Sequence, residues 1–195
     1  MLSHRFEDIV SADLARLGPD ALRDAVAVLP IAAVEQHGAH LPLGTDAMIA
    51  DALVARAIEA LPAQLAATFL PVQRIGTSDE HLSFPGTLSL DWRTGAEVLI
   101  RIGEGVARAG FRRLAVVSSH GGNTQVAEIA ALDLRRRLGL VVATASWNRF
   151  GLPADVFPAG EIARGIHGGA VETALMLRFR PDLVRREAIA DARSL

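Results

Sequence analysis

Five of the six histidines lie in four short polar or glycine-rich clusters. The densest cluster covers residues 35–46, where Glu35, His37 and Asp46 place two carboxylates and an imidazole within twelve residues. Zn²⁺, Mn²⁺ and Fe²⁺ all accept this mixture of ligands, and two carboxylates can hold more than one ion. Asp46 suits a bridging position, because one of its oxygens can face each ion of a pair. The pattern predicts a metal-assisted reaction.

Three further clusters lie at residues 78–81, 119–123 and 167–172. His120 directly follows a run that reads as a buried strand, and this position makes it a candidate metal ligand. The competing interpretation is a strand-to-helix turn that needs glycine for backbone reasons. Asn123 is expected to fix this turn by hydrogen bonds.

Spacing alone leaves the roles of His167 and Glu172 open. They are either members of the same site, or a loop histidine and a glutamate stabilised by the positive end of a helix dipole. The 76–90 segment reads as a long polar loop, and a loop of that length is more often functional or disordered than filler. Within it, Glu80 and His81 are expected to face the substrate or to hold a metal ligand in place.

The composition narrows the class of protein. The chain has 195 residues, half of them apolar, which suits one globular domain over residues 1–195. The net charge of −2 argues against nucleic-acid binding. No apolar run approaches the roughly 20 residues of a membrane span, and the N-terminus has no signal core. The absence of cysteine and lysine excludes thiolate ligands and a Schiff-base lysine, and fits a cytoplasmic protein.

Buried strands and amphipathic helices alternate along the chain. Strands are expected at residues 25–33, 68–72, 113–118 and 140–145, and helices at 46–61, 92–109, 124–138 and from 169 to about 177. Thr45 and Asp91 are expected to cap the first two helices, and Gly110 to end the second. Trp147 follows the last strand, and it either walls a pocket or packs in the core.

This alternation predicts an α/β fold whose mostly parallel sheet is covered on both faces. Such sheets bind ligands beyond the carboxyl ends of their strands. Glu35 and His37 follow the first strand and His120 follows the third, so distant parts of the chain are expected to meet in one crevice.

Together these motifs resemble the creatininase family of amidohydrolases. The matching blocks follow the family's order: Glu35-Gln36-His37-Gly38 with His40-Leu41-Pro42-Leu43 and Thr45-Asp46; Gly76, Ser78 and Glu80-His81 with Phe84-Pro85-Gly86-Thr87; His120-Gly121-Gly122-Asn123; and His167, Gly169 and Glu172-Thr173. The resemblance implies a three-layer α/β/α fold, one or two divalent ions per chain, either Zn²⁺ or Mn²⁺ with Fe²⁺ as a further option, and hydrolysis of a C–N amide bond. It also implies a homo-oligomer, often a hexamer.

The resemblance also implies roles for particular residues. Glu35, Asp46 and His120 would hold one ion, and His37 and Asp46 the second. His167 would match the family's proton-transfer histidine, and Glu172 would be a ligand or orient a water.

The sequence departs from the family pattern at several positions, and two of these departures bear on function and extent. The creatininase that gives the family its name carries a ligand glutamate two residues after the histidine matching His120, where this chain has Gly122. This change argues against creatinine as the substrate. The chain also ends at Leu195, short for the family, which predicts that a C-terminal element is missing or reduced.

These observations lead to a metal-dependent amidohydrolase acting on a small cyclic amide or formamide. A metal-activated water would attack the carbonyl, and His167 would pass the proton to the leaving nitrogen. Two alternatives remain. One is a creatininase-like peptidase that trims a peptide-derived cofactor precursor. The other is a non-catalytic binding subunit, which Gly122 favours and the retained His167 and Glu172 oppose.

Overall fold

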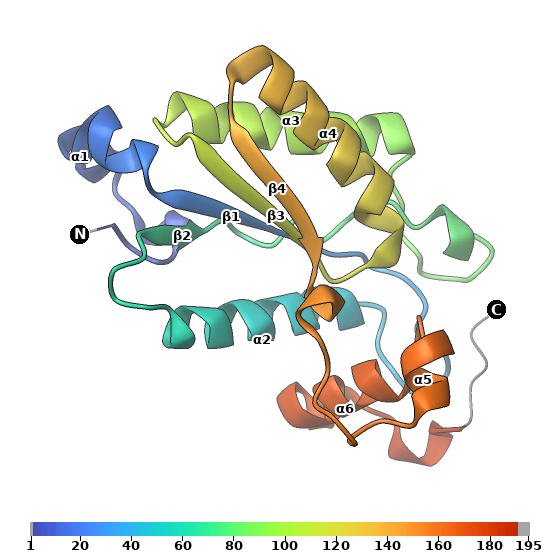
Figure 1. Ribbon diagram of the computed structural model, residues 1–195. Coiled ribbons are helices and arrows are strands. Elements are labelled where there is room, and N and C mark those ends of the chain that lie inside the picture. The colour runs from blue at the N-terminus through green and yellow to red at the C-terminus, as the bar shows by residue number, and fades with distance from the viewer. Residues whose placement is uncertain (1, 191–195) are drawn as a thin grey trace.

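Four parallel strands form the centre of the molecule. The computed structural model describes residues 2–190. The strands stand in the order β2-β1-β3-β4, and every neighbouring pair is parallel (Figure 1). Their bounds are β1 (Val26–Ile31), β2 (Ala67–Phe69), β3 (Arg113–Ser118) and β4 (Val141–Ser146).

Helices cover both faces of this sheet. Figure 1 shows α3 and α4 packed together on one face and α2 on the other, with α6 beyond α2. The α-helices are α1 (Ser11–Arg23), α2 (Thr45–Ala60), α3 (Trp92–Arg108), α4 (Thr124–Leu138), α5 (Ala159–Arg164) and α6 (Ala170–Phe179). Short 3-10 helices are η1 (Phe6–Asp8), η2 (Asp79–His81), η3 (Gly121–Asn123), η4 (Trp147–Phe150), η5 (Pro181–Leu183) and η6 (Arg186–Ala188). The expected α/β fold with a parallel sheet between helical layers is confirmed.

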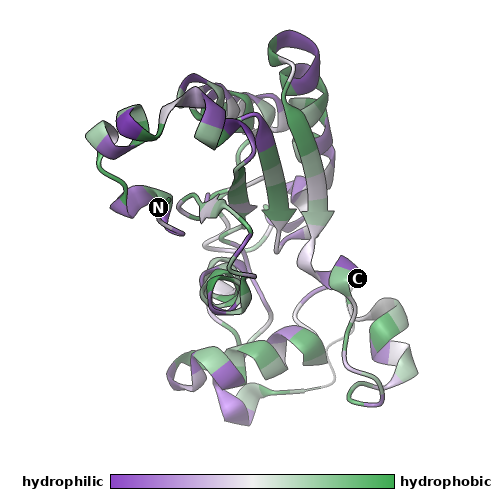
Figure 2. Ribbon diagram, turned by 60° about the vertical axis from the view of Figure 1, so that its left-hand side comes forward, coloured by the Kyte–Doolittle hydropathy of each residue, from purple (hydrophilic) through white to green (hydrophobic). Residues whose placement is uncertain are grey.

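The core lies on both sides of the sheet because successive residues of a strand point to opposite faces. Leu29 and Ile31 of β1 join the larger cluster, which includes Leu99 of α3. Val28 points the other way and packs with Val54 of α2. Strands buried on both faces read as continuous apolar runs, and this holds for the central strands β1 and β3, most of whose residues are buried. Figure 2 shows the central strands of the sheet as largely hydrophobic.

The N-cap of α3 is the residue expected from the sequence, whereas the N-cap of α2 is not. Asp91 caps α3 by accepting hydrogen bonds from the backbone N–H groups of Arg93 and Thr94, as expected. The expected cap by Thr45 is wrong: α2 begins at Thr45, and Gly44 occupies the N-cap position without a side-chain hydrogen bond. The Thr45 hydroxyl donates instead to the Pro42 carbonyl at 2.6 Å, so it is not available to the helix N-terminus.

The second strand is shorter than expected. β2 ends at Phe69 rather than at residue 72. Pro71 has no backbone N–H to continue the ladder, although Gln73 N donates to Pro30 O at 2.9 Å and keeps the segment beside β1. Within residues 2–190, no helix has the length and apolar character needed to cross a membrane.

Candidate metal centre

Chain segments far apart in sequence meet beyond the carboxyl ends of β1 and β3. The segment after β1 carries Glu35 and His37, and the first turn of α2 carries Asp46. His120 directly precedes η3, while Glu172 lies in the first turn of α6. Parallel strands end at the same edge of a sheet, so this convergence follows from the topology.

The first group of ligand atoms surrounds His120. Its Nδ1 lies 3.0 Å from Glu35 Oε1 and 3.5 Å from Asp46 Oδ2. Its Nε2 lies 2.9 Å from the Thr77 carbonyl oxygen, which can only accept, so Nε2 carries a proton and donates it. Nδ1 is therefore the atom of this ring that can bind an ion.

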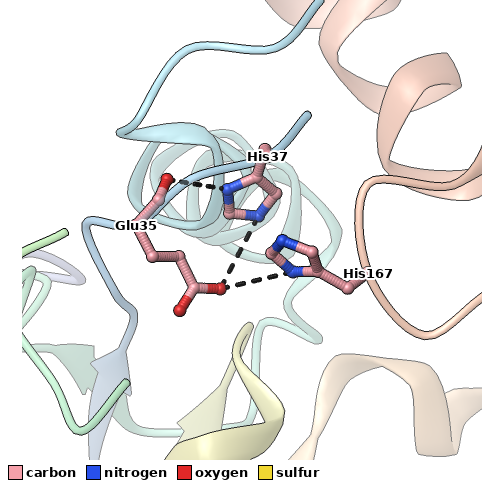
Figure 3. Close-up of side chains that lie close together, drawn as sticks. All are labelled: Glu35, His37 and His167. Carbon is pink, nitrogen blue, oxygen red and sulfur yellow. Dashed lines mark hydrogen bonds and ion pairs between the residues drawn. The ribbon is translucent and has the colours of Figure 1, made fainter. Parts of the chain in front are cut away.

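The second group surrounds His37, which is fully buried. Nδ1 of His37 donates to the Glu35 backbone carbonyl at 3.1 Å, which leaves Nε2 to face the site (Figure 3). This Nε2 lies 3.3 Å from Asp46 Oδ1 and 3.9 Å from Glu172 Oε2. The two oxygens of Asp46 thus face different groups, Oδ2 toward His120 and Oδ1 toward His37.

Buried atoms without hydrogen-bond partners test whether divalent ions fit here. Within residues 2–190, Glu35 Oε1, His37 Nε2 and Asp46 Oδ2 are buried and lack such a partner. Their contacts with one another are close but are not directed as hydrogen bonds. Buried polar atoms are normally satisfied, and these three are the atom types that bind Zn²⁺ or Mn²⁺. The donor set therefore fits a divalent ion.

Without an ion, the side chains of the ligand cluster balance their charges only by holding protons. Burial opposes ionisation of Glu35, but contact with His120 and the Ser78 hydroxyl lowers its pKa to about 2. Burial would lower the pKa of His37, but the Asp46 carboxylate raises it to about 9. The pKa of His120 is raised by Glu35 against the effect of burial, and burial raises the pKa of Asp46. Protons on these histidines occupy the positions that a cation would take.

His167 and Glu172 lie at the border of this cluster. Nδ1 of His167 is 3.4 Å from Glu35 Oε1, and Figure 3 shows the Glu35 carboxylate facing both His167 and His37. Burial, together with the neighbouring His37, lowers the pKa of His167 to about 4. Burial raises the pKa of Glu172 to about 7, although its Oε2 accepts a hydrogen bond of 2.6 Å from Gly168 N.

Glu80 reaches the same region from η2. Its Oε1 lies 3.4 Å from His120 Nε2, and its side chain is half-exposed. A Cβ atom at Gly122 would lie 2.8 Å from that oxygen, 2.4 Å from His120 Nε2 and 2.6 Å from the Thr77 carbonyl. The bare glycine backbone is therefore what allows Glu80 to approach His120.

Two of the expected residues lie apart from the ligand atoms. Asn123 is buried, accepts from Thr77 N at 3.0 Å and donates to Ala32 O at 3.0 Å. It thus joins the segments that carry the site. Trp147 packs against the cluster around Val28, and among residues 2–190 no hydrogen bond or ion pair joins it to the ligand atoms.

Sequence reasoning did not single out Ser78 and Gln36. The Ser78 hydroxyl donates to Glu35 Oε2. The Gln36 side chain lies between two imidazoles, 3.1 Å from His81 Nδ1 and 3.0 Å from His167 Nε2. Both residues lie inside the sequence motifs that carry the candidate ligands, and this position is the feature of the sequence that could have identified them.

Comparison with known proteins places the chain in a family. The model of the creatininase family, described as creatinine amidohydrolase, matches residues 12–195. Creatinine amidohydrolase of Pseudomonas putida is 34% identical over 187 residues, which cover 88% of this chain and 70% of that protein. A mycofactocin precursor peptide peptidase of Mycolicibacterium smegmatis is 34% identical over 157 residues, 80% of this chain but only 58% of that protein.

Solved structures support the same family assignment. A manganese creatininase superposes with a TM-score of 0.78 at 29% identity, covering 97% of this chain and 78% of its own. A zinc–zinc form of a creatininase variant gives a TM-score of 0.78 at 28% identity, and the match covers 98% of this chain and 78% of that structure. The chain belongs to the creatininase family of metal-dependent amidohydrolases, as the resemblance of its motifs predicted.

Proposed function

We propose that this chain hydrolyses the C–N bond of a small cyclic amide or formamide at a centre of two divalent ions, Zn²⁺ or Mn²⁺. Glu35, Asp46 and His120 would hold one ion, and His37, Asp46 and Glu172 the other. The observation that carries this proposal is that Asp46 turns one oxygen to each group. Ions bound there supply Lewis-acid polarisation of the amide carbonyl and lower the pKa of water.

His167 is the residue that moves the proton. Its Nε2 lies 2.6 Å from the Gln36 backbone carbonyl, an acceptor, so Nε2 holds a proton. Because its pKa is lowered to about 4, the ring is neutral at pH 7 and Nδ1 has a free lone pair. Nδ1 faces the Glu35 carboxylate, so we assign it to take a proton from the attacking water and pass it to the leaving nitrogen.

Glu80 holds His120 in place. The Thr77 carbonyl and the Glu80 carboxylate both face the protonated Nε2 of His120, which keeps Nδ1 turned toward Glu35 and Asp46. Carboxylates behind a metal-binding histidine commonly play this part. Glu80 here occupies space that a side chain at Gly122 would fill, so creatinine is not the expected substrate.

A peptidase activity is the second candidate. It is supported by the similarity to the mycofactocin precursor peptide peptidases, of which the chain spans about three-fifths. The non-catalytic alternative loses its support, because the side chains of both proposed ligand groups lie close together and the chain belongs to an enzyme family.

A substrate panel separates these functions. Protein loaded with Zn²⁺ or Mn²⁺ would be incubated with cyclic amides, N-formyl amines, creatinine and short peptides, and the released amine or acid would be quantified. Hydrolysis of a cyclic amide or formamide, lost in His167→Ala at unchanged metal content, is the expected result. Turnover of peptides alone would favour the second candidate, and turnover of nothing would contradict both.

We also infer a cytoplasmic homo-oligomer, with a hexamer as the expected form. The loop that follows η2 exposes several large apolar side chains close to one another in sequence, namely Leu82, Phe84 and Leu88. Such side chains often mark a protein interface. Light scattering coupled to size-exclusion chromatography measures the assembly, and a monomeric mass would contradict it.

A further inference from the structure

The Gln36 side chain has a fixed orientation. Gly38 N, which can only donate, lies 2.9 Å from Gln36 Oε1, so the oxygen end of the amide faces Gly38. The NH₂ end therefore faces the two imidazoles of His81 and His167. Nε2 of His167 already donates to the Gln36 backbone carbonyl, so its 3.0 Å approach to the amide is a contact between two donors and not a hydrogen bond. An amide NH₂ can only donate hydrogen bonds.

This orientation decides where the His81 proton is. Gln36 Nε2 lies 3.1 Å from His81 Nδ1, so Nδ1 must accept a hydrogen bond. A neutral imidazole has one donor and one acceptor nitrogen, so the His81 proton stands on Nε2. Gln36 thus fixes the tautomer of both rings. Its backbone carbonyl accepts the Nε2 proton of His167, and its side-chain amide donates to Nδ1 of His81.

The Nε2–H group of His81 is an unused donor that points toward the ligand cluster. Its nearest carboxylate oxygen, Glu35 Oε1, is 3.9 Å away, too far for a hydrogen bond, and no other partner lies within reach among residues 2–190. The His81 ring stacks on His167, with centroids 4.2 Å apart and planes at 27°. The side chain is partly exposed, so a ligand can reach it.

We propose that His81 is a further catalytic residue, which donates a hydrogen bond from Nε2 to the carbonyl oxygen of the amide that is hydrolysed. This inference rests on the proposed amidohydrolase function. A donor fixed in advance stabilises negative charge as it develops on that oxygen, because no reorientation is needed during the reaction. Gln36 is the positioning residue, since it acts only through His81 and His167.

The proton positions can be measured without turnover. In the zinc-loaded full-length chain labelled with ¹⁵N at histidine, long-range ¹H–¹⁵N correlation spectra distinguish protonated from unprotonated ring nitrogens. We expect His81 to carry its proton on Nε2, and Gln36→Met to replace this pattern by a mixture of both tautomers. A proton on Nδ1 of His81, or an unchanged pattern in Gln36→Met, would overturn the inference.

Kinetics test the catalytic role with the amide of the panel that the wild type hydrolyses. His81→Phe keeps a ring on His167 but removes the donor, and we expect kcat to fall roughly 100-fold with KM and zinc content nearly unchanged. His81→Gln restores an N–H donor and should recover much of kcat. The control is His4→Phe, because His4 lies outside the site and contacts Ala67 O.

The outcomes of these experiments separate the two claims. An unchanged kcat in His81→Phe would overturn the role of His81 and leave the amidohydrolase proposal standing. A wild type that hydrolyses nothing in the panel would defeat the proposed function, while the spectra still decide whether Gln36 and His81 are arranged as inferred.

Discussion

At the residue scale, protons and metal ions compete for the same atoms. The pKa of His37 is raised to about 9 by Asp46, so at pH 7.5 its Nε2 is protonated in the metal-free protein. The pKa of Glu172, raised to about 7, adds a second proton below neutrality. Both protons must leave before these side chains bind an ion.

Metal affinity should therefore rise as the pH is raised toward 9 and fall steeply below 7. Titration calorimetry with Zn²⁺ at pH 7.5, in buffers of different ionisation enthalpy, should show release of about one proton or more per chain. An enthalpy independent of the buffer would contradict this description of the cluster.

Gly122 offers a second test at this scale. In Gly122→Ala the new Cβ would meet His120 Nε2 at 2.4 Å and the Thr77 backbone oxygen at 2.6 Å, so His120 or η2 must move. We expect metal affinity to fall roughly 10- to 100-fold, measured by competition with a chelating dye. Gly121→Ala is the matched control, because its Cβ would meet nothing within 4 Å. Equal affinities in the two variants would show that the space at residue 122 is unimportant.

At the scale of elements, Asn123 holds together the segments that carry the ligands. Its buried amide joins Ala32 after β1 to Thr77 before η2. Removing it leaves buried backbone groups without partners, and each such group is costly.

Asn123→Ala should lower the free energy of unfolding of the chelator-treated protein by about 1–3 kcal/mol, measured by urea denaturation. Asn148→Ala is the control, because Asn148 is exposed in η4 and should change stability by less than about 0.5 kcal/mol. A similar change in both variants would mean that Asn123 does not join these segments. Metal-free protein is used so that loss of ions does not contribute.

The sequence predicted the elements better than their ends and contacts. Apolar runs and the Asp91 cap located the main strands and α3, because periodicity and capping are local properties. The expected Thr45 cap failed because the hydroxyl bonds to Pro42, a contact set by the turn between them. The roles of Gln36 and Ser78 depend on partners more than forty residues away, which no local pattern encodes.

At the scale of the whole molecule, the centre joins parts of the chain that the fold brings together at the carboxyl edge of the sheet. Asp46 comes from α2, His120 from the end of β3, and Glu172 from α6. Ions shared by these residues would link α2, β3 and α6, so the fold and the centre are expected to depend on each other. A centre of two ions depends most on Asp46, because this residue faces both ligand groups.

The most direct test of a two-ion centre is the metal content per chain by elemental mass spectrometry, on protein purified without chelator, for the wild type, His120→Ala and Asp46→Ala. We expect two Zn²⁺ or Mn²⁺ ions per wild-type chain, loss of one in His120→Ala and loss of both in Asp46→Ala. A wild type that holds no metal even after Zn²⁺ or Mn²⁺ is added back, or an Asp46→Ala protein with its full complement of metal, would contradict this expectation.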